Sequence, residues 1–165
     1  MDYKVVDNFL DKESFNKIQE SILYSDTFPW YLSRHITSPH LLEANDGYCF
    51  NHVFYWDCLP NSDYFKLLLP LLELIDYFAL KRIKANFYPK TDNIEYHNYH
   101  VDSHISHKGL LFYLNTNDGF TILEDGTKIE SIENRALFFD PSVLHKSTSC
   151  TDDSVGRFNL IFNYI

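Results

Sequence analysis

The pattern of hydrophobic and polar positions changes character near Lys81. Before it, the segment from Asp11 to Ser25 has the periodicity of an amphipathic helix. Its apolar residues Phe15, Ile18 and Ile22 fall at spacings that place them on one helical face. The acidic residues at its start suit the positive end of a helix dipole. We therefore predict an N-terminal helix that packs one face against a core.

A second helix is predicted from about Ser62 to Phe78. This segment is apolar almost all round, which indicates a buried helix, and Pro70 inside it predicts a kink or a break. The segment between the two helices, Thr27 to Cys58, is irregular and rich in aromatic residues. It either carries recognition loops or caps one end of the core, and the sequence favours neither interpretation.

After Lys81 the chain consists of short strand-like runs separated by turn residues. The eight runs are Arg82–Tyr88, Tyr96–Asp102, Leu110–Asn115, Phe120–Glu124, Thr127–Glu130, Ala136–Phe139, His145–Ser149 and Arg157–Tyr164. Asp125-Gly126 predicts a tight hairpin, and Asn117-Asp118-Gly119 predicts a second turn. This texture predicts a mainly β fold of the α+β class, a jelly roll with N-terminal helices packed on it.

No linker, repeat or low-complexity tract divides the 165 residues. We therefore expect a single domain, 1–165, in which residues 1–81 form a helical and irregular support region and residues 82–165 form the jelly-roll core. An aromatic content of 17% agrees with a β-rich fold, because aromatic side chains suit the half-buried surface of a sheet.

A net charge of −9 disfavours nucleic acid as a partner, since a negative field repels a phosphate backbone. The basic cluster Lys81, Arg82, Lys84 and Lys90 is spread thinly, and we interpret it as solvated residues at a strand edge. The longest apolar stretch is too short to span a bilayer, so no membrane partner is expected. The sequence does not predict the oligomeric state.

The cysteine pattern favours a reducing compartment. Cys49, Cys58 and Cys150 are odd in number and form no C-x-x-C pair, so they predict no closed disulfide framework. The first residues of the chain lack the apolar core of a signal peptide. We therefore expect a cytoplasmic protein, in the host cytoplasm if the chain is viral.

Three residues form a candidate metal site. His100 and Asp102 flank Val101 in one predicted strand, where residues two apart project from the same face. His145 follows Pro141 at the start of a later strand. Two imidazoles and one carboxylate form the facial triad that suits Fe(II), because three protein ligands leave other positions open for reactants. A structural zinc site would instead have four protein ligands.

A second set of residues suits a dicarboxylate cosubstrate. Arg157 and Asn159 share a face of the last predicted strand, and a guanidinium gives a carboxylate two parallel donors. Asn86 and Tyr88 share a face of an earlier strand, and Tyr113 adds a phenolic donor.

Each of these residues also has an ordinary structural interpretation. An H-x-D pair arises often by chance, and a buried histidine bonded to a neighbouring aspartate would explain it. His97, His104 and His107 flank the motif as other candidate ligands, although we expect them at the surface or behind the ligands. Arg157 alone fits a surface salt bridge, and the two tyrosines fit core packing.

Over roughly Arg82 to Tyr164, these residues together resemble the 2-oxoglutarate/Fe(II)-dependent dioxygenase superfamily. The superfamily's pattern of H-x-D, a distant histidine and a later arginine is met by His100, Asp102, His145 and Arg157. The resemblance implies a distorted double-stranded β-helix fold. It also implies Fe(II), 2-oxoglutarate and O2 as cofactor and cosubstrates, with ascorbate as a candidate reductant.

The stretch looks most like the prolyl-hydroxylase branch. Tyr88-Pro89 precedes the H-x-D, Phe112-Tyr113-Leu114-Asn115 follows it, and Phe138-Phe139-Asp140-Pro141-Ser142 leads into His145. This resemblance implies that Tyr88 and Tyr113 line the cosubstrate pocket. The short length is also similar to compact viral members of the superfamily. The leading hypothesis is therefore a hydroxylase that acts on a protein or peptide side chain, or on another macromolecule.

Two alternatives remain open from the sequence. Asn86-x-Tyr88 and Arg157-x-Asn159 also look like the nucleic-acid demethylase branch, but Asn163 stands where that branch has a further arginine. A non-enzymatic jelly-roll binding module would keep the scaffold and lose the chemistry. Its expected sign, a broken triad or a missing arginine, is absent from the sequence.

Overall fold

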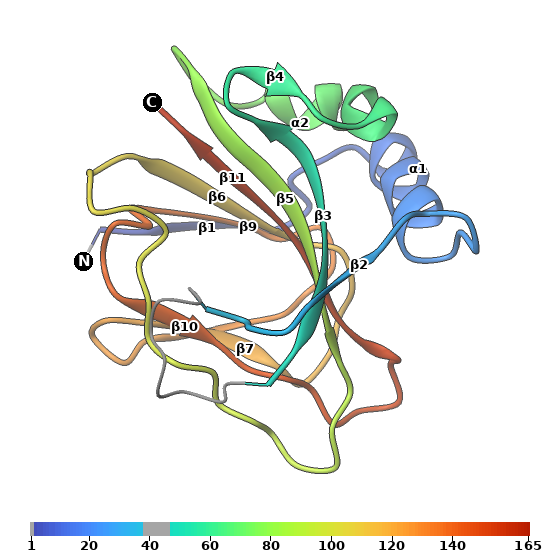
Figure 1. Ribbon diagram of the computed structural model, residues 1–165, viewed down its shortest axis with the longest axis vertical. Coiled ribbons are helices and arrows are strands. Elements are labelled where there is room, and N and C mark those ends of the chain that lie inside the picture. The colour runs from blue at the N-terminus through green and yellow to red at the C-terminus, as the bar shows by residue number, and fades with distance from the viewer. Residues whose placement is uncertain (1, 38–46) are drawn as a thin grey trace.

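The protein is described by a computed structural model over residues 2–37 and 47–165. Two antiparallel sheets face each other (Figure 1). In order, the large sheet contains β1 (Lys4–Val6), β9 (Ala136–Phe139), β6 (Lys108–Tyr113), β11 (Gly156–Tyr164), β5 (Leu80–Pro89), β3 (Cys49–Trp56) and β2 (Tyr31–Ser33), and β4 (Leu59–Pro60) pairs with β3. The small sheet contains β10 (His145–Ser147), β7 (Phe120–Leu123) and β8 (Lys128–Glu130).

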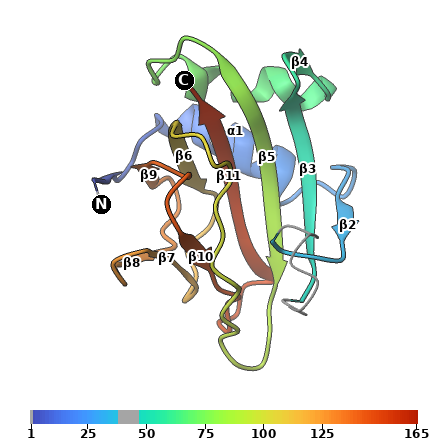
Figure 2. The same cartoon turned by 60° about the vertical axis from the view of Figure 1, so that its left-hand side comes forward.

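The helices lie on the outer side of the large sheet, and the small sheet covers its inner side (Figure 2). This is the jelly-roll, double-stranded β-helix arrangement with N-terminal helices that the sequence predicted. One hydrophobic cluster fills the space between the helices and the outer side of the sheet. A smaller cluster, which includes Leu111, Leu123 and Ile161, lies between the two sheets. The rest of the inner side borders a cavity between the two sheets.

The first predicted helix is confirmed as α1 (Lys12–Ile22). Asp11 caps it, because its carboxylate accepts a hydrogen bond of 2.9 Å from the Ser14 backbone N–H. The buried residues are the predicted Phe15, Ile18 and Ile22. Phe15 meets Phe112 of β6 edge-on, with ring centroids 6.0 Å apart, and so anchors the helix to the sheet.

The second predicted helix is much shorter than expected. The chain forms a 3-10 helix, η1 (Asp63–Leu68), and then a single α-helical turn, α2 (Leu69–Leu72). Pro70 occupies the first turn of α2. Proline has no N–H to donate to the preceding turn, so η1 cannot continue through it as an α-helix. The predicted break is confirmed, and the predicted extent to Phe78 is wrong.

The N-terminal region contributes strands where the sequence predicted irregular structure. Both β3 and β2 come from the Thr27–Cys58 segment; β3 pairs with β5, and β2 pairs with β3. Part of that segment, residues 38–46, lies outside the described residues. Phe28 and Phe54 are buried in the core, whereas Tyr31 and Tyr48 are exposed. The segment therefore both caps the core and presents aromatic rings, because its alternating residues face opposite sides.

Seven of the eight predicted runs after Lys81 correspond to strands, and the run Tyr96–Asp102 does not. It makes only isolated bridges, from Tyr96 to Thr148 and from His100 to His145. The Asp102 N–H bonds to the Pro141 carbonyl at 2.8 Å. Proline has no N–H to return a hydrogen bond, so the two-way ladder of a strand pair cannot extend there.

The Asp125-Gly126 hairpin is confirmed between β7 and β8. Gly126 has a φ of +85°, a conformation that glycine adopts without steric cost.

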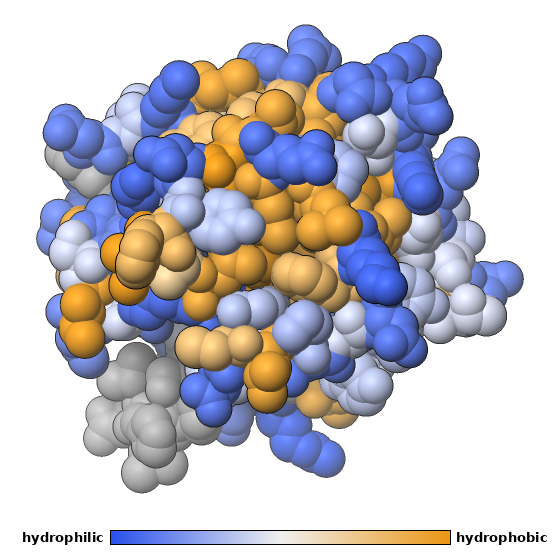
Figure 3. All heavy atoms as spheres, turned by 90° about the horizontal axis from the view of Figure 1, so that it is seen from above, coloured by the Kyte–Doolittle hydropathy of each residue, from blue (hydrophilic) through white to orange (hydrophobic). Residues whose placement is uncertain are grey.

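Seen from above, the molecule shows a broad hydrophobic area over the end that carries β4 and α2 (Figure 3). Exposed side chains there include Leu59, Leu69 and Phe78. None of the helices in residues 2–37 and 47–165 combines the length and hydrophobicity needed to cross a lipid bilayer.

Ile18→Ala should destabilise the fold by about 2–5 kcal/mol, because the side chain is fully buried and its removal leaves a cavity beneath α1. Urea unfolding followed by circular dichroism measures this loss. Lys17→Ala, one residue away on the exposed face, is the control and should change stability by less than about 0.5 kcal/mol. Equal losses in the two variants would contradict the packing described here.

Candidate metal and cosubstrate site

Two neighbouring strands form one wall of the site. β5 and β11 pair antiparallel, and their register sets Tyr88 opposite Arg157 and Asn86 opposite Asn159. The strand prediction that placed these residues on shared faces is confirmed by this register. The same face continues with Lys84 opposite Ile161 and then with Arg82 opposite Asn163. Two strands distant in sequence thus present a mainly polar wall.

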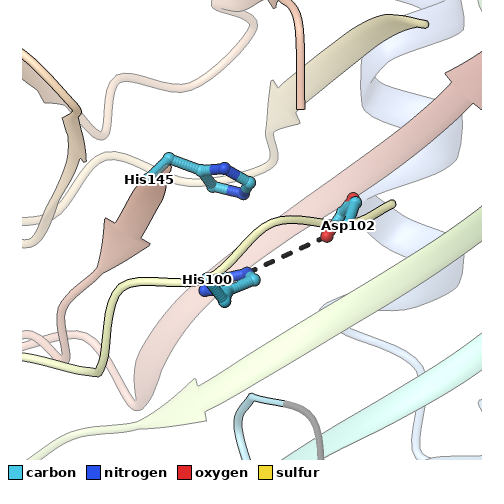
Figure 4. Close-up of side chains that lie close together, drawn as sticks. All are labelled: His100, Asp102 and His145. Carbon is cyan, nitrogen blue, oxygen red and sulfur yellow. Dashed lines mark ion pairs between the residues drawn. The ribbon is translucent and has the colours of Figure 1, made fainter. Parts of the chain in front are cut away.

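His100, Asp102 and His145 converge in front of this wall (Figure 4). One nitrogen or oxygen atom of each lies within 4.8 Å of the corresponding atoms of the other two. His145 comes from β10, and the other two come from the segment beside it. The imidazole centroids of His100 and His145 are 4.5 Å apart, and His100 Nε2 lies 3.8 Å from Asp102 Oδ1.

Both imidazoles are oriented by backbone carbonyls. His145 Nδ1 lies 2.9 Å from the Val143 carbonyl oxygen, and His100 Nδ1 lies 3.3 Å from that of Asn98. A carbonyl only accepts, so each Nδ1 must carry the proton and each Nε2 keeps its lone pair. This tautomer, fixed by the atom behind the ring, is the arrangement that metal-binding histidines use.

Asp102 is fixed through one of its two oxygens. Arg82 Nη2 lies 2.8 Å from Oδ2, and Asn163 Nδ2 donates to the same oxygen at 2.9 Å. Oδ1 therefore remains on the side of the histidines. Asn163, which stands where the nucleic-acid demethylase branch has an arginine, thus helps to position Asp102.

The electrostatics keep the donor atoms of His100 and Asp102 deprotonated. Burial lowers the pKa of His100 to about 4, and the neighbouring His145 adds to this shift. Burial alone would raise the pKa of Asp102, but the Arg82 charge, His145 and the Asn163 hydrogen bond together hold it well below its usual range. A neutral imidazole and a carboxylate are the protonation states in which these groups bind a divalent metal ion.

The three donors border a cavity of about 460 Å³. Its described lining includes Arg82, Lys84, Asn86, Tyr88, Arg157 and Asn159 on the β5–β11 wall. The opposite wall includes Thr121, Lys146 and Ser147 of the small sheet. This volume lies in the range of small-molecule sites, and polar groups converge on it.

Arg157 is fully buried, which contradicts the interpretation as a surface salt bridge. Its Nε donates to Ser131 Oγ at 2.6 Å, and its Nη2 donates to Thr121 Oγ1 at 2.7 Å. Within residues 2–37 and 47–165 it makes no ion pair with a carboxylate. A buried cation with neutral partners is costly, so the site suits an anionic ligand that approaches from the cavity.

Of the other predicted cosubstrate residues, three line the cavity and one lies behind it. Tyr88 lines the cavity, and the Arg157 guanidinium carbon is 5.7 Å from its ring centroid. Asn86 and Asn159 also line it and are joined by a hydrogen bond of 3.0 Å between their amides. Tyr113 is buried behind the cavity, where its hydroxyl donates to Thr121. Tyr113 therefore holds Thr121, which accepts a hydrogen bond from Arg157, and it does not line the cavity.

The flanking histidines lie outside the convergent group. His97 is buried, with Nδ1 2.7 Å from Ser147 Oγ and its ring beside Tyr88. His107 is buried with Nδ1 against the Ile105 carbonyl, whereas His104 is exposed at the cavity. As expected, none of the three joins the donor cluster in the described part of the chain.

Arg82 and Lys84 are site residues that the sequence reasoning missed. The interpretation as solvated strand-edge residues is wrong for both, because they line the cavity. Burial and the neighbouring Arg82 charge lower the pKa of Lys84. The signal was present in the sequence: Arg82, Lys84, Asn86 and Tyr88 alternate along one strand, so they must share a face.

A second group of potential metal ligands, Asp118, Cys150 and Asp152, lies away from this cavity. The Asp118 carboxylate already accepts hydrogen bonds from the backbone N–H groups of Thr151 and Asp152. Burial raises the pKa of the Cys150 thiol, which disfavours the thiolate that binds metals. The histidine-containing cluster is therefore the better candidate.

Comparison with solved structures identifies the fold. A member of the 2OG-Fe(II) oxygenase family from Burkholderia pseudomallei aligns with 98% of this chain and 84% of its own, with a TM-score of 0.70 and 13% identity. A viral collagen prolyl hydroxylase from Paramecium bursaria Chlorella virus-1, solved with 2OG, covers 98% of this chain and 94% of its own, with a TM-score of 0.63 and 13% identity. The chain has the fold of the 2-oxoglutarate/Fe(II) oxygenases.

A third similar structure, also 13% identical, is a prolyl hydroxylase from Trichoplax adhaerens in complex with a peptide fragment of the hypoxia-inducible factor oxygen degradation domain. It aligns with 98% of this chain and 83% of its own, with a TM-score of 0.64. No family model matches the sequence, and neither does any curated protein. The resemblance to this superfamily that the sequence suggested is thus confirmed at the level of the fold.

The metal-free protein should lose stability as the pH falls from 6.5 towards 4. Over this range the unfolded chain protonates His100 at its ordinary value, whereas the folded protein resists protonation until about pH 4. The unfolded state then binds more protons, so this contribution of at most about 3 kcal/mol is present above pH 6.5 and is lost on acidification. Urea unfolding at several pH values measures it. His100→Gln should flatten the dependence, and an unchanged slope would contradict the burial of this imidazole.

Proposed function

We propose that this protein is a 2-oxoglutarate- and Fe(II)-dependent dioxygenase that hydroxylates a side chain of a protein or peptide. One observation carries the proposal: three convergent donors border the same cavity as a buried Arg157, which has no carboxylate partner among the described residues. The donors offer a metal ion two imidazole nitrogens and one carboxylate oxygen and leave further positions open. Arg157 offers a carboxylate a pre-oriented guanidinium.

His100, Asp102 and His145 would hold the iron, and Arg157 would hold the distal carboxylate of 2-oxoglutarate. When bound, the iron and cosubstrate supply the oxidation, in which R–H, 2-oxoglutarate and O2 become R–OH, succinate and CO2. The chain's own share is to orient these groups and to exclude water. Arg82 and Asn163 keep Asp102 Oδ1 directed at the histidines, and Thr121 and Ser131 keep the guanidinium in place.

A peptide acceptor is supported by two observations. Tyr88-Pro89 and Tyr113 match the prolyl-hydroxylase pattern, and the Trichoplax protein with the same fold was solved with a peptide. The net charge of −9 supports a peptide over a nucleic acid.

Purified protein supplied with Fe(II), 2-oxoglutarate and ascorbate should form succinate, with more formed when an acceptor peptide is present. Asp102→Ala should abolish this turnover and weaken Mn(II) binding beyond the about 10–100-fold expected for loss of an outer-shell partner. Asp92→Ala removes an exposed carboxylate outside the cavity and should leave both unchanged.

The absence of succinate in the wild-type protein, with or without peptides, would remove the main support for an enzyme and favour a jelly-roll binding module. Wild-type turnover by Asp102→Ala would mean that the carboxylate ligand is misassigned. Formaldehyde release from methylated oligonucleotides would instead favour the nucleobase demethylase alternative.

Arg157→Gln should weaken 2-oxoglutarate binding by about 30-fold or more, since it removes one partner of a buried charge pair. Calorimetry with Mn(II) in place of Fe(II) measures this without turnover. Arg157→Lys keeps the charge but loses the two parallel donors, so its affinity should be intermediate. Retained Mn(II) binding shows that each variant is folded, and an unchanged 2-oxoglutarate affinity in folded Arg157→Gln would contradict the assignment.

A further inference from the structure

Lys84 occupies the middle of the cavity wall, and the side chains opposite it on the two neighbouring strands are apolar. It lies on β5 between Arg82 and Asn86, on the face that lines the cavity. Its neighbours in register are Ile161 on β11 and Val53 on β3, and neither side chain offers an acceptor. Its polar neighbours among the described residues therefore lie on the cavity side of the sheet.

Within the described part of the chain, Lys84 makes no ion pair and no side-chain hydrogen bond. Asp102 is the one acidic residue among the described cavity residues. Its Oδ2 already accepts from Arg82 and Asn163, and its Oδ1 faces His100. Asp102 is therefore committed to the metal site: it attracts the Lys84 ammonium from a distance but makes no ion pair with it.

The cavity is strongly cationic although the protein is acidic. Its described lining carries Arg82, Lys84, Lys146 and Arg157 against the single carboxylate of Asp102. Arg82 pairs with that carboxylate, and the Lys146 ammonium lies over the Tyr96 and Tyr99 rings at 5.2 and 4.3 Å from their centroids. An Fe(II) ion and a 2-oxoglutarate dianion cancel each other, so the loaded cavity keeps its excess of positive charge.

We propose that Lys84 binds a carboxylate of the substrate that is oxidised, so that this substrate is an acidic peptide side chain or a free organic acid. The inference rests on the proposed oxygenase function, which assigns the metal donors and Arg157 to the iron and the cosubstrate. It goes further, because a prolyl-hydroxylase-like pattern alone implies no charge on the acceptor. A lysine ammonium on the cavity wall favours a carboxylate over the corresponding neutral amide.

The position of Lys84 separates it from the cosubstrate's distal anchor. Residues on one face of a strand are spaced by about 6.7 Å, so Lys84 lies about 13 Å along β5 from Tyr88, the partner of Arg157. Lys84 is therefore no second anchor for the distal carboxylate. The cations lie inside a cavity and not on an outer face, which favours a small carboxylate over a phosphate backbone.

The test compares matched acids and amides on the full-length protein loaded with Mn(II) and saturating 2-oxoglutarate under nitrogen. The probes are capped peptides with Asp or Glu against the same peptides with Asn or Gln, and free aspartate and glutamate against asparagine and glutamine. The two series distinguish a peptide from a free acid as the source of the carboxylate. Calorimetry should show at least about tenfold tighter binding of the acid in one series.

Lys84→Met should abolish this preference, and Lys84→Arg should restore most of it, since arginine keeps the charge. Lys90→Met removes an exposed lysine at the other end of the same segment and should leave the preference intact. In aerobic assays with Fe(II), the preferred acid should increase succinate formation in the wild type more than its amide does.

Equal binding of acids and amides by the wild type, including no binding of either, would overturn the inference. So would a Lys84→Met protein that loses 2-oxoglutarate affinity as Arg157→Gln does, because Lys84 would then serve the cosubstrate. A preference for oligonucleotides over all carboxylates would overturn it as well. Failure of the oxygenase proposal is separate: no succinate would form, whatever the acid–amide difference in binding.

Discussion

The antiparallel pairing of β5 with β11 determines where the charged and polar groups of the cavity lie. A single register places Tyr88 against Arg157, Asn86 against Asn159 and Arg82 against Asn163. A shift of one residue would turn every one of these side chains to the opposite, hydrophobic face. That face is buried under α1, η1 and α2, so the helices make the correct register the stable one. The site depends on this pairing more than on any single hydrogen bond.

The two arginines of this wall, Arg82 and Arg157, have partners of different kinds. Arg82 faces the aspartate of the donor cluster, whereas Arg157, at the other end, has only neutral partners among the described residues. A buried charge is costly unless something compensates it. The Asp102 carboxylate compensates the charge of Arg82, and this ion pair positions Asp102 Oδ1. Arg157 and Lys84 line the cavity, so an anion bound there would compensate their charges.

The donor cluster shows how a site can be built without regular structure. His100 and Asp102 do not lie in a strand, yet they are fixed by backbone bonds to His145 and Pro141. The Nδ1 atoms of the two histidines face carbonyl oxygens, and Asp102 is held by Arg82 and Asn163. Each ligand thus has a partner behind it, and this restraint directs its free lone pair inwards.

The sequence by itself determined α1 and most strands of the jelly roll, and it singled out His100, Asp102, His145 and Arg157 as candidates, because these depend on local periodicity and on residue chemistry. It also contained the alternation that places Arg82 and Lys84 with Asn86 and Tyr88. Only the tertiary structure decided that β2 and β3 extend the sheet, since strand pairing depends on partners distant in the chain. It alone decided that Arg157 is buried with no carboxylate partner among the described residues, that Tyr113 lies behind the cavity and that Asn163 positions Asp102. Burial and charge pairing are set by which strands become neighbours, and no local pattern carries that information.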